Sequence, residues 1–294
     1  MNLARRVLEL RLWQHLINED LKRNRFRIPV HVAMGHEAIA VAVDEAMGPR
    51  DALLLTHRNI AYNLARTRAF EPVREHYLSG PLGSMNLANP EAGIVYSSSI
   101  LGNNLPVACG VAWADRVAGR DAAAWVLTGD GAMEEGSFWE SLVFARSHAL
   151  PVIFLVENND HSLASRIEER RCAIDLAGLC GAAGVPFTAL AGNHADRYRE
   201  QLGALREQAT NGPVCAEVKL KTLTNHAGAT PGWAADPKKI SLEAGLVVEE
   251  TELDPAWVAR GSFDADDYAS ALSSLLELAI RLSPEVECPA TSKV

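Results

Sequence analysis

An aspartate between two glycines is the first feature of this sequence with an evident chemical use. The apolar segment AAAWVLT is followed by Gly129, Asp130 and Gly131, and the apolar segment PVIFLVE is followed by Asn158 and Asn159. Carboxylate and amide oxygens suit Mg²⁺, which is commonly bound together with phosphate oxygens. The glycines allow a tight turn and a close approach of the backbone to an anion, which the N-terminus of a following helix also favours. The pattern indicates binding of a magnesium diphosphate.

Each of these signals has an ordinary structural explanation when it is taken alone. An aspartate before a helix commonly caps that helix, and asparagines after a strand commonly form turns. Both signals, however, follow consecutive predicted strands of one β-α-β unit. Ligands of parallel sheets bind beyond the carboxyl ends of the strands. We therefore expect Asp130 and Asn159 to meet at one edge of a sheet.

The elements that position these residues alternate between strand and helix. This alternation predicts an α/β fold with a doubly wound, mostly parallel sheet and helices on both faces. Apolar residues at helical spacing predict helices over residues 2–24, 35–48, 60–68, 103–119, 137–149, 172–184, 195–210 and 266–283. Short apolar runs predict strands within residues 51–59, 122–131, 151–159, 186–190 and 213–223. The first helix has charges between its apolar residues and should pack on the body or on a partner.

We expect three parts in the chain. Residues 1–50 form N-terminal helices that pack on the core, and residues 51–223 form the diphosphate- and magnesium-binding α/β domain. Residues 224–294 form an active-site loop and a C-terminal helical tail. A further long loop at 79–99 is rich in Gly, Ser, Pro and Asn, and long loops of this kind often carry function.

Composition excludes several classes of protein. The chain has 294 residues, is 48% hydrophobic, and can bury a sizeable core. Its net charge of −9, with scattered Lys and Arg, argues against nucleic acid or an anionic membrane surface as a partner. The five cysteines form no CxxC pair and no signal-peptide pattern precedes them, so we expect reduced thiols in a cytoplasmic protein. The apolar runs are too short to span a bilayer, and no GxGxxG indicates a nicotinamide site.

The order of motifs resembles a known family. GDG, a helix and then ENN is similar to the thiamine diphosphate motif. The segments GHEAIAVAV, THRNIAYNLAR, GSMNL, ILGNNLPVACGVAWA and LPVIFLVENN resemble, in this order, the alpha subunit of the decarboxylating first component of 2-oxo acid dehydrogenase complexes. The likeness runs from Gly35 to Ser165 and extends weakly to the loop NHAG at 225–228.

The resemblance implies thiamine diphosphate and Mg²⁺ as cofactors. It places the metal on Asp130, Asn159 and the backbone carbonyl of His161, and it places His226 on a loop over the active site as the candidate catalytic residue. The guanidinium of Arg58 is suited to gripping phosphate oxygens. The cofactor contacts that the resemblance implies are, besides Asp130 and Asn159, those of His57, Arg58, Ser99, Leu101, Gly129, Gly131 and Ala132.

Three positions depart from the family pattern. His57 stands where the family usually has Tyr, His36 where it usually has Gln, and Val143 where Asn is common. The segment EGSFWE is closer to transketolases, which hold the metal in the same way. The metal site is the same in both cases, but the substrate is not. The alternative is therefore the N-terminal subunit of a split transketolase-like ketol transferase. A third hypothesis is a non-catalytic subunit, but the presence of both Asp130 and Asn159 argues against it.

The resemblance also implies an incomplete active site. The family acts on a 2-oxo acid, with decarboxylation and acyl or acyloin transfer, in some cases to a lipoyl-bearing acyltransferase. In this superfamily the glutamate that activates the cofactor lies in a pyrimidine-binding domain. About seventy residues remain outside the predicted sheet, too few for such a domain, and Glu37 and Glu140 are expected to be structural. We therefore expect a beta-type subunit to supply the glutamate in an α2β2 assembly.

Overall fold

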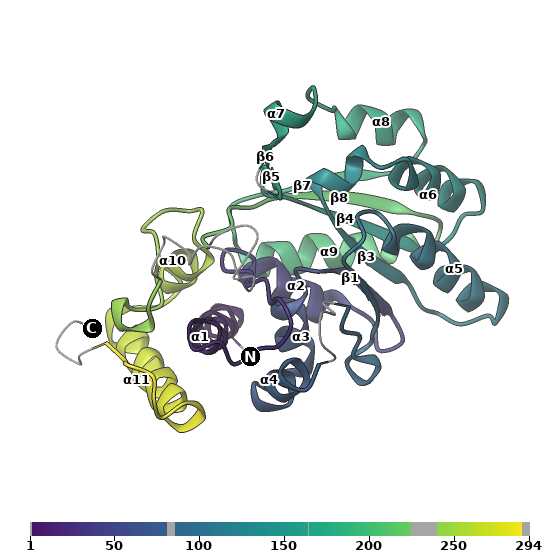
Figure 1. Cartoon of the computed structure of the whole chain (residues 1–294). Coiled ribbons are helices and arrows are strands. Elements are labelled where there is room, and N and C mark those ends of the chain that lie inside the picture. Colours follow the sequence, from purple (N-terminus) through teal and green to yellow (C-terminus); the bar gives the residue numbers. More distant parts are fainter. Residues whose placement is uncertain (1, 81–85, 164, 225–239, 290–294) are drawn as a thin grey trace.

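A six-stranded parallel sheet forms the centre of the computed structural model, which describes residues 2–80, 86–163, 165–224 and 240–289 (Figure 1). The strand order is β2-β1-β3-β4-β8-β7, and β5 and β6 form a separate antiparallel pair. The strands are β1 (Ala52–Thr56), β2 (Ile94–Ser98), β3 (Ala124–Gly129), β4 (Val152–Asn158), β5 (His161–Ser162), β6 (Ser165–Arg166), β7 (Phe187–Leu190) and β8 (Val214–Lys219). The predicted fold class, a doubly wound parallel α/β sheet, is confirmed.

The helices surround this sheet. The α-helices in the described ranges are α1 (Leu3–Lys22), α2 (Glu37–Ala46), α3 (Ile60–Thr67), α4 (Glu71–Leu78), α5 (Asn104–Val117), α6 (Gly136–Ser147), α7 (Ile167–Arg170), α8 (Leu176–Ala182), α9 (Ala195–Ala209), α10 (Pro255–Arg260) and α11 (Ala265–Leu282). Short 3-10 turns are η1 (Pro90–Ala92), η2 (Asp130–Glu134) and η3 (Leu242–Ala244).

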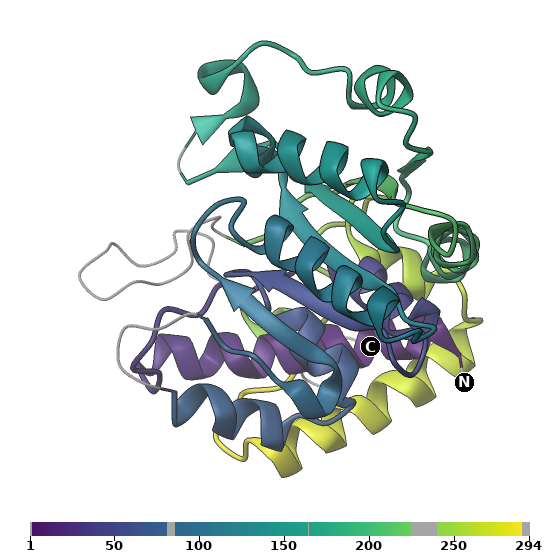
Figure 2. The same cartoon turned by 90° about the vertical axis from the view of Figure 1, so that its right-hand side faces the viewer.

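Alternate residues of each strand pack on opposite faces of the sheet. In β3, Trp125 and Leu127 belong to the apolar cluster shared with α1, α2, α3 and α9, whereas Val126 belongs to the cluster under α5, α6 and α8. Figures 1 and 2 show α5 and α6 on one face and α1 on the other. Burial on both faces explains why the strands are continuous apolar runs instead of alternating patterns. It also fixes which polar residues emerge at the strand ends.

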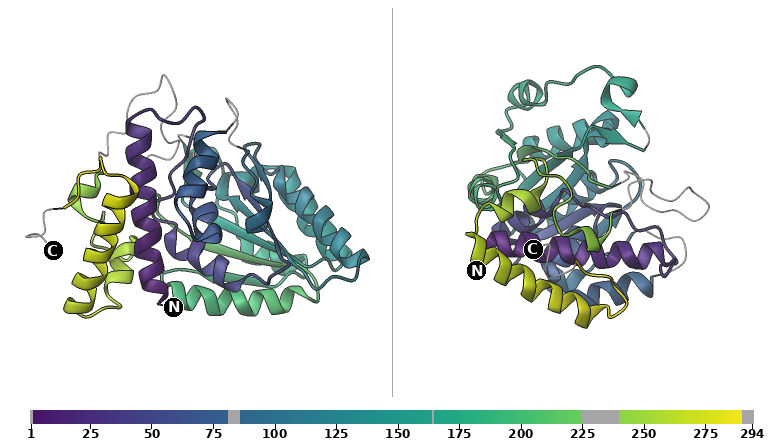
Figure 3. Two further views of the ribbon diagram at one scale, coloured as in Figure 1. Left: turned by 90° about the horizontal axis from the view of Figure 1, so that it is seen from below. Right: turned by 90° about the vertical axis from the view of Figure 1, so that its left-hand side faces the viewer.

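The first helix is more enclosed than its sequence predicts. The predicted helix packs on the body, as expected, but α1 buries polar residues along with apolar ones, among them Arg6, Arg11 and Gln14. The reason is that α10 and α11 cover its outer side, so that α1 lies between them and the sheet-bearing part (Figure 3). The charges that the sequence suggests for solvent are used in internal ion pairs instead.

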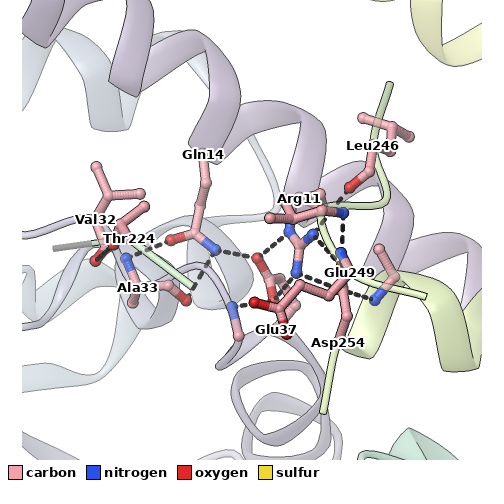
Figure 4. A network of polar contacts seen from close by, with 12 residues as sticks. Arg11, Gln14, Val32, Ala33, Glu37, Thr224, Leu246, Glu249 and Asp254 are labelled. Carbon is pink, nitrogen blue, oxygen red and sulfur yellow. Dashed lines mark hydrogen bonds and ion pairs between the residues drawn. The ribbon is translucent and has the colours of Figure 1, made fainter. Parts of the chain in front are cut away.

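Two of these ion pairs share Arg11 and join three distant segments (Figure 4). Arg11 Nε and Nη2 donate to the two Glu37 carboxylate oxygens at 2.6 and 2.9 Å, and Nη2 also donates to Asp254 Oδ1 at 2.8 Å. All three side chains are fully buried. Glu37 Oε2 further accepts from the backbone N–H of Gly35 at 2.9 Å. The network therefore ties α1 and the segment before α10 to the turn that opens α2, and the expectation that Glu37 is structural agrees with its contacts.

The region predicted as a loop at 79–99 contains a strand. Residues Ile94–Ser98 form β2, which pairs with β1 at the edge of the sheet, with a register irregularity between Leu53 and Leu54. The sequence IVYSS has β-forming residues, but its neighbouring Gly, Pro and Asn residues obscured them, and only one side of the strand needs a partner. The helix α4 also lies outside the predicted elements, and α8 and β8 are shorter than predicted.

None of the helices in the described ranges is long and apolar enough to cross a membrane. The five cysteines all lie in the described ranges and none of them forms a disulfide.

Candidate cofactor site

Two neighbouring strands end at the same edge of the sheet. β3 and β4 pair in parallel from Ala124 and Val152 up to Gly129 and Glu157. The chain beyond β3 enters η2 at Asp130, and the chain beyond β4 passes Asn159 before it reaches β5. The pairing of β3 and β4 thus places both polar segments side by side, as the β-α-β pattern of the sequence predicts.

A pocket opens at this edge. It is lined by His36, Thr56, His57, Arg58, Ser98, Ser99, Ile100, Leu101, Gly102, Gly129, Asp130, Gly131, Ala132, Glu157, Asn159, His161 and Ser162. Every site residue named from the sequence that falls within the described ranges is in this lining. His226, the candidate catalytic residue, lies outside the described residues.

Asp130 is buried, and only one of its two carboxylate oxygens has a hydrogen-bond partner among the described residues. Its Oδ2 accepts a hydrogen bond from Arg170 Nη2 at 2.7 Å, whereas Oδ1 is buried without a hydrogen-bond partner among the described residues. Burial raises the pKa of the Asp130 carboxyl, and the Arg170 guanidinium and the nearby backbone amides of Asp130 and Asn159 oppose that rise only in part. A buried carboxylate oxygen without a partner is costly. A cation bound at Oδ1 would remove that cost.

Hydrogen bonds at both the nitrogen and the oxygen hold the side chain of Asn159. Asn159 Nδ2 donates to Thr222 Oγ1 at 3.1 Å, and its Oδ1 accepts from the backbone N–H of His161 at 3.2 Å. The preceding Asn158 is used differently, since its Nδ2 donates to Glu217 Oε1 at 2.8 Å. Of the two asparagines, only Asn159 therefore presents itself to the pocket.

A hydrogen-bond chain behind Asn159 fixes this orientation. Because Thr222 Oγ1 accepts from Asn159, its own proton is available for His36 Nε2, which lies 3.1 Å away. His36 Nδ1 can then donate to Glu157 Oε1 at 2.9 Å, which also accepts from the hydroxyl of Tyr62 at 2.7 Å. This assignment uses every donor once. The Asn159 carboxamide then presents its oxygen, not its nitrogen, to a cation, because that oxygen has a second lone pair besides the one that accepts from His161.

The glycines of GDG differ in their surroundings. A Cβ on Gly131 would lie 2.4 Å from Ser162 Oγ and 2.6 Å from Ser162 Cβ, so η2 and β5 approach each other at this point as only glycine allows. A Cβ on Gly129 would meet nothing within 4 Å. Gly129, which lines the pocket, therefore borders open space.

Two basic residues follow β1 at the same edge. Burial lowers the pKa of Arg58 to about 10, although the Glu157 charge opposes this, so the guanidinium is charged at neutral pH. Burial and the neighbouring Arg58 charge lower the pKa of His57 to about 4, so its imidazole is neutral there. His57 packs edge-on against His31, with ring centroids 4.8 Å apart. The positive charge at this wall of the pocket thus comes from Arg58.

The donor set suits a hard cation. Within the described ranges, no group of three His, Cys, Asp or Glu side chains is arranged to hold a metal. The pocket offers the Asp130 carboxylate, the Asn159 carboxamide and backbone carbonyls, which are the oxygen donors that Mg²⁺ accepts alongside phosphate and water.

Sequence reasoning missed four residues of this site. Glu157 and His36 were visible in the motifs but had no assigned role, and Thr222 had no signal at all. Arg170 lies in the charged run RIEERR, where an arginine is usually only a solvated side chain. Its ion pair with Asp130 depends on the fold of β5, β6 and α7 back onto η2, which no local pattern reports.

Comparisons with known proteins show the family to which the chain belongs. The sequence model of the family described as Dehydrogenase E1 component matches residues 5–218. The alpha subunit of acetoin:2,6-dichlorophenolindophenol oxidoreductase from Cupriavidus necator is 27% identical over 237 residues, which are 77% of this chain and 71% of that one. The mitochondrial pyruvate dehydrogenase E1 component subunit alpha from Saccharomyces cerevisiae is 30% identical over 151 residues, 49% of this chain and 36% of that one.

A solved transketolase structure from Pichia stipitis shares the fold. It superposes with a TM-score of 0.59 at 18% identity and covers 96% of this chain but 47% of the transketolase chain. At this identity the likeness concerns the fold alone. Since the family model matches most of the chain and the curated relatives are alpha subunits, the chain belongs to the dehydrogenase E1 component family as an alpha-type member.

Proposed function

We propose that this chain binds thiamine diphosphate and Mg²⁺ in the pocket at the carboxyl edge of the sheet, and acts with a beta-type subunit on a 2-oxo acid. The observation that carries the proposal is the buried Oδ1 of Asp130, which has no hydrogen-bond partner among the described residues. It lies in a pocket that Asn159, Gly129, Gly131 and Arg58 also line. Family membership supports the same cofactor, and the alternation of strands and helices explains why these residues meet.

In this proposal each group has a distinct task. Asp130 Oδ1, Asn159 Oδ1 and the backbone carbonyl of His161 hold the metal, while Gly129, Gly131 and Ala132 border the diphosphate. Arg58 neutralises diphosphate charge in a buried setting, where such a pairing is stronger than in water. Ser99 and Leu101 lie where the aminopyrimidine would be. The bound cofactor supplies an electron sink for cleaving the bond next to a carbonyl.

The partner in this proposal is a beta-type subunit with the pyrimidine-binding domain, in an α2β2 assembly. The relatives' names as alpha subunits support it. An exposed apolar face on α5 and α6 also supports it: Val117 is 77% exposed and Val143 54% exposed, and the rings of Trp113 and Phe144 stack with centroids 5.6 Å apart. An apolar surface of this kind is typical of subunit contacts.

The names of the relatives support a substrate class. One is named for acetoin and the other for pyruvate, so a 2-oxo acid is the first candidate and an acyloin such as acetoin is the second. A lipoyl-bearing acyltransferase would be the acyl acceptor in the first case. Ketol transfer, suggested by EGSFWE, has support from the fold alone.

Co-expression with the beta-type subunit tests this proposal. We expect turnover of 2-oxo acids or acetoin with 2,6-dichlorophenolindophenol only when both subunits, thiamine diphosphate and Mg²⁺ are present, and none with this chain alone. Val117→Asp and Val143→Asp should weaken co-purification, because each places a charge on the apolar face. Ile280→Asp is the matched control, since Ile280 is 52% exposed but lies on α11 at the opposite end of the molecule (Figure 1). Full turnover by the isolated chain would refute the need for a partner.

The two glycines of GDG give a second test. Gly129→Ala should leave the free energy of unfolding unchanged, because its Cβ meets no protein atom, but should weaken thiamine diphosphate binding about tenfold if the diphosphate fills that space. Gly131→Ala should also destabilise the fold by about 1–3 kcal/mol through the clash with Ser162. Calorimetric titration and urea unfolding separate the two effects. Unchanged cofactor affinity in Gly129→Ala would place the diphosphate elsewhere.

A further inference from the structure

We infer that Arg170 is a positioning residue of the metal site: it holds the Asp130 carboxylate by Oδ2 and so keeps Oδ1 open for the cation. The inference rests on the proposed function, because it presumes that Asp130 is a metal ligand. It concerns a residue outside the motifs that define the site. Its basis is the arrangement of polar atoms around α7 and η2.

The guanidinium of Arg170 is engaged on three sides. Nη2 donates to Asp130 Oδ2 at 2.7 Å, Nε donates to Glu134 Oε1 at 3.0 Å, and Nη1 donates to the backbone carbonyl of Ser165. Its side chain is only 14% exposed. A planar group with three fixed acceptors has little freedom to rotate. The Asp130 carboxylate is therefore held at one oxygen in a defined direction.

This arrangement divides the carboxylate between two partners. One oxygen of Asp130 is paired with Arg170, and the other is buried with no partner among the described residues. Mg²⁺ needs near-ideal octahedral positions for its ligands, so a carboxylate free to rotate binds it poorly. Groups that hydrogen-bond to a metal ligand, and thereby orient it, typically contribute 10- to 100-fold to metal affinity. Arg170 has the position of such a group.

Charge does not make Arg170 a competitor of the metal. The acids at this point, Asp130 and Glu134, are matched by two arginines, because Arg171 Nε also donates to Glu134 Oε1 at 3.2 Å. The guanidinium charge is thus already offset locally, and the diphosphate would bring further negative charge to the pocket. Repulsion between Arg170 and the cation is therefore small compared with the loss of ligand geometry when Arg170 is removed.

The test compares Arg170 with its neighbour. Arg171 shares Glu134 but makes no contact with Asp130, so Arg171→Gln is a matched control for Arg170→Gln. Mg²⁺ is titrated into the full chain at saturating thiamine diphosphate, with binding followed by calorimetry. We expect Arg170→Gln to weaken Mg²⁺ binding 10- to 100-fold, with Arg171→Gln within about threefold of the unmodified chain. Metal-free melting temperatures control for folding.

A conservative variant separates geometry from charge. Arg170→Lys keeps the positive charge but cannot reach all three acceptors, so it should recover only part of the affinity. Full recovery would show that charge alone matters, and unchanged or tighter binding in Arg170→Gln would show that Arg170 does not position Asp130. Either result overturns the inference alone. Failure of the unmodified chain to bind thiamine diphosphate with Mg²⁺ would instead refute the proposed function, and the inference with it.

Discussion

Asp130→Ala is expected to abolish magnesium-dependent binding of thiamine diphosphate, with a loss of affinity on the order of 100-fold or more. The substitution removes the carboxylate that the proposed site places on the cation. It also removes a buried oxygen that has no hydrogen-bond partner among the described residues. In the metal-free chain, removal of this uncompensated oxygen is stabilising, whereas loss of the ion pair between Asp130 Oδ2 and Arg170 is destabilising. The melting temperature of the metal-free chain should therefore change little. Calorimetric titration with and without Mg²⁺ measures the first effect, and thermal melting the second.

A charge-removing pair provides the control for this prediction. Asp130→Asn keeps the shape of the side chain and one oxygen but loses the negative charge, so we expect a large part of the affinity to be lost. Asp160→Asn makes the same change one residue beyond Asn159, at a carboxylate that accepts from the backbone N–H of Ile167 and does not line the pocket. It should bind the cofactor normally. Equal losses in both variants would mean that general charge, not coordination at Asp130, governs binding.

Arg11→Met is expected to have the largest effect on stability, a loss of about 3–5 kcal/mol in the free energy of unfolding. The change leaves Glu37 and Asp254 buried without their cation. Burial alone would lower the pKa of Arg11, but the pairs with Glu37 and Asp254 raise it above its usual value. Asp254 keeps its hydrogen bonds from the backbone amides of Val248 and Ala256, so part of the network survives. Arg5→Met on the exposed side of the same helix should cost less than about 0.5 kcal/mol.

The pH dependence of stability provides a second signature of this network. Burial raises the pKa of Asp254, but Arg11 and the backbone donors lower it further, so the net pKa is below its usual value. The stability that Asp254 contributes is then present above its unfolded pKa of about 3.9 and is lost as the pH falls below it. In Arg11→Met the Asp254 carboxylate is buried without a cation, and its pKa should rise above the unfolded value. The variant should therefore become more stable as the pH falls from 7 toward 5. Urea unfolding at several pH values between 7 and 5 measures the free energy of unfolding of both chains. The Asp254 contribution should stay constant in the unmodified chain and stability should rise in Arg11→Met; parallel pH profiles would contradict this prediction.

Much of the fold could be predicted because the signals are local. The runs AAAWVLT and PVIFLVE are buried on both faces, and their apolar continuity is what a parallel central strand requires. Strand β2 was missed because an edge strand has weaker constraints and IVYSS lies among turn-forming residues. The enclosure of α1 was missed for a different reason: its covering helices come from the other end of the chain, and no pattern within residues 3–22 reports them.

The same division applies to the candidate site. Asp130 and Asn159 were accessible from sequence because strand ends converge at one edge of a parallel sheet. Arg170 and Thr222 were not, since each reaches the site from a segment whose path is set by tertiary packing. Thr222 follows β8, two residues beyond Leu220, and meets Asn159 only because β8 pairs with β4. Residues that orient ligands are in general the part of a site that spacing does not reveal.

Anomalous diffraction can show whether Asp130 and Asn159 jointly hold the cation of a metal diphosphate. Crystals of the chain with its partner would be grown with Mn²⁺ in place of Mg²⁺ and with thiamine diphosphate. We expect one manganese peak within coordination distance of Asp130 Oδ1 and Asn159 Oδ1, beside diphosphate density over Gly129. Cofactor density in this pocket with the metal bound to neither side chain, or cofactor bound away from this pocket, would contradict it.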